Sequence, residues 1–326
     1  MLPQRLAIFA GMMSLAIVGG LHWQHPLPVM ARPHLRALST NAPASFQVAK
    51  PTQSNKHHFS TVSFIPTSLQ QSANPNPGSR NIFGKDERIP MNSSKYPWSA
   101  IGRIDIPLSA TTLKICTGTL IAKNIVLTNA HCVVDEATGA FHKQPIVFRP
   151  NLVNGQSHDQ AKVIKVLVGT KDIKRQPGAD WALLTLDQPL GEKYGFLGWI
   201  NADLADLDAL KQAFNLAGYS GDFPQDQPGS TAGVHKGCSI RGITSVPGVL
   251  SHDCDMTQGA SGGPIFVVQP NGSVVIVAVN EAERVDATVH AQQAPKFTAS
   301  AANLGIAAVN WSAAACELAP QRCQTR

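Results

Sequence analysis

Three short motifs hold a histidine, an aspartate and a serine that could act together on a substrate. His131 lies in the stretch LTNAHCV, Asp180 directly precedes the apolar run WALL, and Ser261 lies in the glycine-rich stretch QGASGGP. A serine hydroxyl is a poor nucleophile until a neighbouring base takes its proton, and a carboxylate can orient that base. The three residues together therefore predict nucleophilic catalysis at a serine.

Each motif also has an ordinary structural interpretation when it is taken alone. An isolated histidine is usually structural or solvated, an aspartate before a strand is usually a turn residue, and Gly-Ser-Gly is usually a loop. The order histidine, aspartate, serine along one chain is more specific, because the same three residues occur in other orders on unrelated folds.

Short apolar runs from residue 99 onward, separated by turn residues, predict the strands that would position these side chains. The sequence Pro270-Asn271-Gly272 between two such runs is typical of a hairpin. Regular short strands with glycine and proline between them indicate an all-β sandwich or barrel. One helix is expected near the C-terminus, where Ser312 could cap a run that reaches Leu318.

Six cysteines follow residue 80, and an even number in a chain with a secretory signal favours disulfides. Six cysteines allow fifteen pairings, and the sequence alone does not choose among them. Nearest-neighbour pairing would join Cys116 to Cys132, Cys238 to Cys254 and Cys316 to Cys323. No C-x-x-C pair occurs, and His131 is adjacent to Cys132 rather than at a zinc-ligand spacing. Because phosphate loops, EF-hands and dinucleotide fingerprints are also missing from the sequence, we expect no cofactor and no metal, with a structural calcium site on a loop as the alternative.

The net charge of +6 lies entirely in the first quarter of the 326-residue chain. Residues 1–80 carry six basic groups and no acid, so residues 81–326 hold 21 basic and 21 acidic groups. A balanced body gives no reason to expect nucleic acid as a partner. No apolar stretch reaches the roughly 18–20 residues of a membrane span, and 43 % hydrophobic residues are enough for a sizeable core.

The first eighty residues have the composition of targeting and processing segments. Arg5 precedes an apolar run at 6–18, and Val29-Met30-Ala31 offers small residues for cleavage, which predicts a signal peptide over residues 1–31. An uncleaved anchor is the alternative. Residues 32–80 are rich in Ser, Asn, Gln, Pro and Ala, which predicts a weakly ordered low-complexity propeptide or linker. Residues 81–326 are then the functional domain.

The chain from about Asn81 to Leu318 resembles the chymotrypsin-like serine peptidases, in particular the bacterial branch that includes the glutamyl endopeptidases. The resemblance rests on CTGTLI at 116–121, LTNAHCV at 127–133, Asp180 and GASGGP at 259–264. It implies two six-stranded antiparallel Greek-key barrels, a C-terminal helix and an active site between the barrels.

The resemblance also implies a role for each motif residue. Ser261 would attack the scissile carbonyl, His131 would take and return the proton, and Asp180 would hold the imidazole. The backbone N–H groups of Gly259 and Ser261 would form the oxyanion hole. An inactive homologue that serves as an extracellular binding module is the alternative.

Four residues are expected to form the substrate pocket, and they are Asp255, Val279, Asn280 and Glu281. Asp255 lies six residues before the serine, where trypsin-like enzymes have the carboxylate that pairs with arginine or lysine. Glutamyl endopeptidases read glutamate partly through a histidine on the next strand, and the matching place here is Val279. Glu281 and Glu283 add negative potential, so we expect cleavage after arginine or lysine, with small, apolar or glutamate residues as alternatives.

Arg80 precedes a stretch that resembles the mature start of the bacterial branch. Cleavage there would convert a zymogen into the mature enzyme. We expect a monomer that is secreted or periplasmic, acts on protein or peptide substrates, and has no stable membrane insertion after processing.

Overall fold

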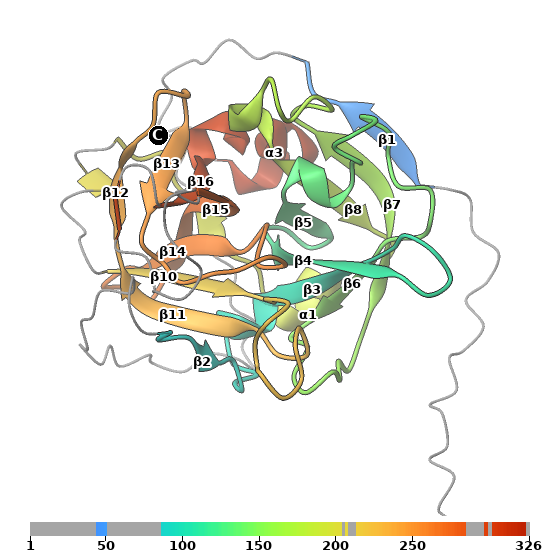
Figure 1. The fold of residues 1–326 in the computed structure, drawn as a ribbon, viewed down its shortest axis with the longest axis horizontal. Helices are drawn as coiled ribbons and strands as arrows, with labels where there is room; N and C mark the ends of the chain where they lie inside the picture. Colours follow the sequence, from blue (N-terminus) through green and yellow to red (C-terminus); the bar gives the residue numbers. More distant parts are fainter. Residues whose placement is uncertain are drawn as a thin grey trace, which may run out of the picture. The chain divides into compact units, whose positions relative to one another are not determined.

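The computed structural model describes residues 44–50, 86–203, 206–207, 213–284, 297–298 and 302–323, and most of this chain is β-structure. The strands form two sheets (Figure 1). None of the described helices is long and apolar enough to cross a membrane. The predicted signal peptide and Arg80 lie outside the described residues.

The first sheet is a closed barrel with one added strand. Six antiparallel strands follow the order β7-β6-β3-β4-β5-β8, and the pairing of β7 with β8 closes the barrel. The strands are β1 (Ser45–Val48), β3 (Ile101–Pro107), β4 (Leu113–Leu120), β5 (Ile125–Thr128), β6 (Val147–Pro150), β7 (Ala161–Val168) and β8 (Ala182–Leu186). The residues of β5 are all buried between β4 and β8, because this strand consists of branched apolar residues and a threonine.

The second sheet has nine strands in the order β12-β13-β16-β15-β14-β10-β11-β2, and β9 pairs with β15 outside this path. Its strands are β2 (Ile89–Pro90), β9 (Gly198–Trp199), β10 (Phe214–Gly218), β11 (Gly233–Cys238), β12 (Ile240–Ile243), β13 (Val249–His252), β14 (Pro264–Val268), β15 (Val274–Arg284) and β16 (Ala302–Ala307). The predicted hairpin at 270–272 joins β14 to β15 and is confirmed.

A short C-terminal helix, α3 (Ser312–Leu318), is also confirmed, and a second helix, α1 (Leu190–Tyr194), follows β8. In Figure 1, α3 lies at the top between the strands of the two sheets. Arg322 follows α3 in the sequence and donates a hydrogen bond to the carbonyl of Ile121. Its guanidinium lies 4.3 Å from the ring centre of Phe196. The all-β fold class with a C-terminal helix is therefore confirmed, although the second sheet is larger than the six strands expected.

The three disulfides join Cys116 to Cys132, Cys238 to Cys254 and Cys316 to Cys323, which is the nearest-neighbour pairing. The first links β4 to the 3-10 turn that carries His131 (Ala130–Cys132).

One element differs from the sequence-based expectation. Residues 45–48 fall inside the stretch that composition predicts to be weakly ordered, yet they form β1 on the first barrel. Composition averages over the whole segment, and it misses a four-residue strand that gains its hydrogen bonds from a partner far along the chain.

Candidate active site

Asp180 and His131 meet because their strands are antiparallel neighbours. His131 follows the end of β5 and Asp180 precedes the start of β8, and Thr128 pairs with Ala182 where these two ends lie together. Asp180 Oδ2 is 2.6 Å from His131 Nδ1, and Asp180 Oδ1 accepts the backbone N–H of His131 at 2.9 Å. Asn129 donates to the backbone carbonyl of Asp180, so the aspartate is held from both sides.

This arrangement determines which nitrogen of His131 can act as a base. An ionised carboxylate only accepts hydrogen bonds, so the Nδ1 atom that faces Asp180 carries the proton. The neutral ring then has its lone pair on Nε2. A histidine in this tautomer can take a proton from a hydroxyl that approaches Nε2.

Ser261 lies in a tight bend that only glycines can complete. Gly259 and Gly262 flank it with φ values of 100° and 86°, a region that favours glycine. A Cβ atom on Gly262 would lie 2.1 Å from the carbonyl oxygen of Thr117. The close approach lets Thr117 N–H donate to the Ser261 carbonyl at 2.8 Å, so the first barrel directly supports the bend.

The Thr117 side chain makes a second link between the sheets. Its hydroxyl donates to the carbonyl of Gly259 at 3.0 Å and accepts the N–H of Tyr219 at 2.8 Å. Both contacts are buried. The sequence analysis did not single out this threonine, because its partners lie more than one hundred residues away in the chain.

Two N–H groups of the bend point to no acceptor. The N–H groups of Ala260, Gly262 and Gly263 all donate to backbone carbonyls. Within the described part of the chain, the N–H groups of Gly259 and Ser261 have no such acceptor. Buried N–H groups are normally paired, so this pair is available to an oxygen that enters the site.

The hydroxyl of Ser261 donates to the backbone carbonyl of Glu281 at 3.2 Å. In the described residues it makes no hydrogen bond to His131. Hydrogen bonds of this kind are often long or misaligned in a free enzyme and form when a substrate is bound.

These residues line one cleft of about 970 Å³ to which both sheets contribute. Its walls include His131, Asp180, Gly259, Ser261 and Glu281. Residues 114–116 of β4 and residues 281–283 of β15 also line the cleft.

The side chain of Lys114 also belongs to this cleft and was missed by the sequence analysis. Its Nζ donates to the backbone carbonyl of His131 at 2.7 Å, so the cation lies against the turn that carries the histidine. Burial lowers the pKa of Lys114. No local sequence pattern marks this lysine, because only the folding of β4 beside the turn brings it there.

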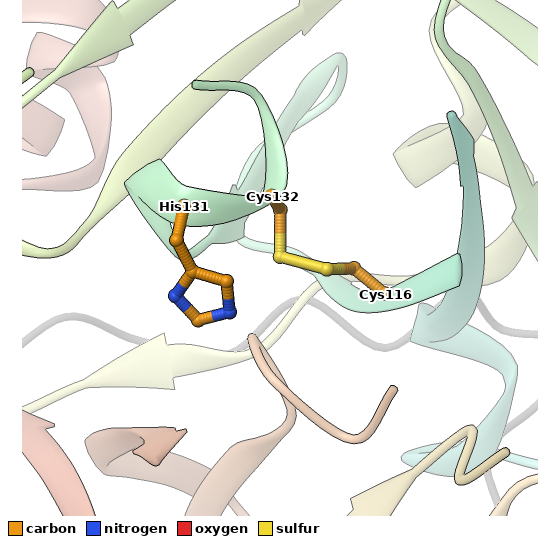
Figure 2. Close-up of side chains that lie close together, drawn as sticks. All are labelled: Cys116, His131 and Cys132. Carbon is orange, nitrogen blue, oxygen red and sulfur yellow. A yellow bond between two sulfur atoms is a disulfide. The ribbon is translucent and has the colours of Figure 1, made fainter. Parts of the chain in front are cut away.

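Figure 2 shows His131 beside the disulfide of Cys116 and Cys132. One ring nitrogen of His131 and the two sulfur atoms lie within 4.8 Å of one another. Both sulfurs are already used in the disulfide, and a metal ligand would have to be a free thiolate. The disulfide therefore fixes the turn that carries His131 relative to β4, and this cluster is not a metal site.

The structure brings only one of the four expected pocket residues into the cleft, and that residue is Glu281. Val279 and Asn280 are fully buried, with Val279 in the core and the Asn280 amide donating to the carbonyl of Ala260. The register of β15 against β16 shifts between Asn280 and Ala282, so Glu281 is an extra residue in this strand. A bulge re-aims a side chain, and at this bulge Glu281 lines the cleft while Val279 and Asn280 stay buried.

Asp255 is not among the residues that line this cleft. Its Oδ2 accepts the backbone N–H of Glu87 at 3.0 Å, and its own N–H donates to the His235 ring. Burial raises the pKa of Asp255 to about 7. The carboxylate that was expected in the pocket thus accepts a hydrogen bond from the segment that follows Arg80.

Arg88 fastens the same segment to the loops beside the serine. Its guanidinium binds Asp86 and Asp222 and also donates to the hydroxyl of Thr257. Its side chain is only 6 % exposed, whereas the carboxylates of Asp86 and Asp222 are 47 % and 52 % exposed. Residues 86–88 therefore lie against the loop that leads to Ser261.

Glu281 is a buried carboxyl next to the other acids of the cleft. One of its oxygens, Oε2, is buried and has no hydrogen-bond partner in the described residues. Burial, followed by the charges of Asp180 and Glu136, raises the pKa of Glu281 to about 8. At neutral pH the group is therefore largely an uncharged carboxylic acid.

A cleft between two β-sheets that holds a serine, a histidine and an aspartate in this geometry is the arrangement of the chymotrypsin-like serine peptidases. Residues 116–277 match the family model described as a trypsin-like peptidase domain. Residues 116–277 therefore match a trypsin-like peptidase domain, and the fold is that of the chymotrypsin-like serine peptidases.

Two known proteins and one solved structure are similar to this chain. A glutamyl endopeptidase of Bacillus licheniformis is 23 % identical over 188 residues, which are 57 % of this chain and 55 % of that protein. Serine protease 23 of Bos taurus is 26 % identical over 222 residues, which are 61 % of this chain and 54 % of that protein. The alignments thus span little more than half of each relative.

The fold is similar to that of a Glu endopeptidase solved in complex with MPD. The TM-score is 0.54 at 21 % identity, and the match covers 69 % of this chain and 92 % of that one. At this identity the likeness concerns the fold alone.

Proposed function

We propose that this protein is a serine endopeptidase that hydrolyses peptide bonds through an acyl-enzyme. Ser261 is the nucleophile, His131 is the general base and acid, and Asp180 orients the imidazole. The observation that carries the proposal is the pair of hydrogen bonds that Asp180 accepts from the ring and backbone of His131, in the same cleft as Ser261.

The steps follow from the positions of these atoms. His131 Nε2 takes the hydroxyl proton while Ser261 Oγ attacks the substrate carbonyl carbon. The same ring then gives the proton to the leaving amine, which leaves an ester on Ser261. Water, activated by His131, cleaves the ester and returns the serine hydroxyl. Asp180 stays ionised throughout and stabilises the imidazolium.

The N–H groups of Gly259 and Ser261 form the oxyanion hole. Their lack of acceptors in the described structure supports this role. Donors that are fixed before the reaction stabilise the oxyanion without reorganisation, and one such donor contributes roughly 100- to 1000-fold in kcat.

The substrate preference that Glu283 favours is arginine or lysine before the cut. Glu283 lines the cleft on β15, two residues after the neutral Glu281. The basic side chains Arg103 and Lys114 come from the first barrel, where Arg103 is bound by Asp105 and Lys114 donates to the His131 carbonyl. A glutamate side chain would face Glu283, and an unpaired buried charge is costly.

Glutamate before the cut is the alternative, and the name of the Bacillus licheniformis relative favours it. Peptide substrates that differ only in this residue separate the two. Under our proposal Glu283→Gln lowers kcat/KM for an arginine substrate by up to about fivefold, the value of an exposed ion pair, and leaves a leucine substrate unchanged. A wild-type enzyme that strongly prefers glutamate would contradict the basic preference.

Processing and location complete the proposal. Residues 1–31 are a signal peptide, residues 32–80 a propeptide, and 81–326 the protease domain, which becomes active after cleavage at Arg80. The docking of residues 86–88 against the loop before Ser261 supports a link between the new N-terminus and the site. Three disulfides suit a secreted or periplasmic monomer.

Labelling with an organophosphorus probe tests the enzyme assignment. We expect the probe to add to Ser261, as read by peptide mass mapping, and to leave Ser261→Ala unlabelled. Ser273→Ala, which changes a serine in the β14–β15 turn, is the matched control and should label as the wild type does. A folded wild-type protein with no labelled serine would support the alternative of an inactive homologue that binds peptides.

A further inference from the structure

The strand β1 comes from the N-terminal segment and occupies one edge of the first barrel. Ser45–Val48 pair in parallel with Lys165–Val168 of β7, and the N–H of Ala49 donates to the carbonyl of Val168 at 2.7 Å. In Figure 1, β1 (blue) lies alongside β7 (green) at the outer side of this barrel.

The edge that β1 covers would otherwise be open. β8 pairs with β7 from Val163 to Val168, whereas β6 pairs only with Ala161 and Lys162. Among the described residues, β1 alone covers this side of the second half of β7. Unpaired strand edges are templates for an added strand, and natural proteins normally cover them.

One side chain anchors the added strand. Phe46 stacks on Phe141 with ring centres 4.5 Å apart and the planes inclined by 26°. Lys171 Nζ lies 5.5 Å from the centre of the same Phe141 ring. The side chain of Val48, by contrast, is 47 % exposed, so the side-chain contribution to docking rests mainly on Phe46.

The anchor also touches a loop that reaches the cleft. Phe141 forms an isolated bridge with Val134, and the loop between these residues contains Glu136, which lines the cleft. Docking of β1 thus supports the base of a loop that begins three residues after His131.

We propose that residues 44–49 are a strand ligand of the first barrel that stays bound when the chain between residues 50 and 86 is cut. The processed enzyme is then a non-covalent complex of the protease domain and its own N-terminal segment. Backbone hydrogen bonds along an edge give such strand addition its affinity, and a side-chain pocket gives it specificity. This inference does not require cleavage at Arg80 or any catalytic activity.

The test uses the full chain with Ser261→Ala, so that the protein cannot process itself. A recognition sequence for a site-specific protease is inserted between residues 70 and 80, the chain is cut, and the products are separated by native size exclusion. We expect the N-terminal fragment to elute with the protease domain in a 1:1 ratio by mass spectrometry. Adding Phe46→Ala should release the fragment, and the matched control Val48→Ala should retain it.

Hydrogen exchange gives a second measurement on the same cut sample. We expect the backbone amides of the edge at Lys165–Val168 to keep the protection that they have in the uncut chain. A fragment that elutes separately from the Ser261→Ala protein, together with fast exchange at these amides after cutting, would overturn the proposal.

Discussion

Asp180 accepts two hydrogen bonds from His131, one from the ring Nδ1 and one from the backbone N–H. The two bonds use different carboxylate oxygens, so the aspartate fixes the ring and the turn that carries it at the same time. Because Asp180 is only 1 % exposed, water does not compete for these bonds. The side chain at position 180 must therefore accept a hydrogen bond at each of its two terminal atoms.

Asp180→Asn should therefore lower kcat by about 10⁴-fold while the protein stays folded. An amide offers N–H donors toward Nδ1, which favours the tautomer that places the proton on Nε2, where the base is needed. Steady-state kinetics at neutral pH measure the loss, and circular dichroism checks the fold. Asp187→Asn, at an exposed position beyond the other end of β8, is the control and should retain activity. Near-normal turnover in the Asp180 variant would contradict the assignment.

Thr117→Val should destabilise the protein and lower kcat, because the hydroxyl serves two buried partners on the second sheet. The carbonyl of Gly259 and the N–H of Tyr219 would each lose a hydrogen bond, at about 1–3 kcal/mol for a group left unsatisfied. Thr119→Val is a matched control on the same strand, since the buried Thr119 hydroxyl has no partner in the described residues. Urea unfolding should show a clear loss for the first variant and little change for the second. Equal losses would contradict the special role of Thr117.

Gly262→Ala should abolish the tight bend at the serine. The added Cβ would lie 2.1 Å from the Thr117 carbonyl oxygen, and the backbone is already in the region that favours glycine. We expect a loss of several kcal/mol or failure to fold. Gly272→Ala in the β14–β15 turn has a similar φ but open space around it, so it should cost only about 1 kcal/mol. Thermal melts of both variants measure the difference, and similar melting temperatures would argue against the close approach.

Glu281→Gln should change how stability depends on pH. The folded pKa of about 8 lies above the ordinary value of 4.5, so between these values the folded state holds a proton that the unfolded state has released. Wild-type stability therefore falls as pH rises through this window, by about 1.4 kcal/mol per pH unit from this group. Glutamine does not titrate, and the stability gained by the variant should grow from pH 4.5 to 8 and then level off.

The melting temperatures of the wild type and of Glu281→Gln, measured across this pH range, test the prediction. Glu192→Gln, which removes an exposed carboxylate beside Lys123, is the control for the loss of an acid at the surface. A stability difference between wild type and Glu281→Gln that stays constant from pH 4.5 to 8 would show that this carboxyl is not held neutral.

The three candidate catalytic residues can be predicted from the sequence, whereas many of the contacts that surround them cannot. The residues His131, Asp180 and Ser261 stand in short local motifs, so their types and order are visible without a structure. The contacts of Thr117 and Lys114 depend on chain segments that meet only after folding. The bulge at Glu281 breaks the alternation that strand counting assumes, and no local sequence pattern marks it.

The most direct test of the proposed mechanism is peptide hydrolysis by purified Ser261→Ala. The account predicts that kcat falls by about 10⁶-fold relative to the processed wild-type enzyme, with unchanged circular dichroism. Hydrolysis at a rate close to that of the wild type, by a variant free of contaminating protease, would contradict catalysis at Ser261.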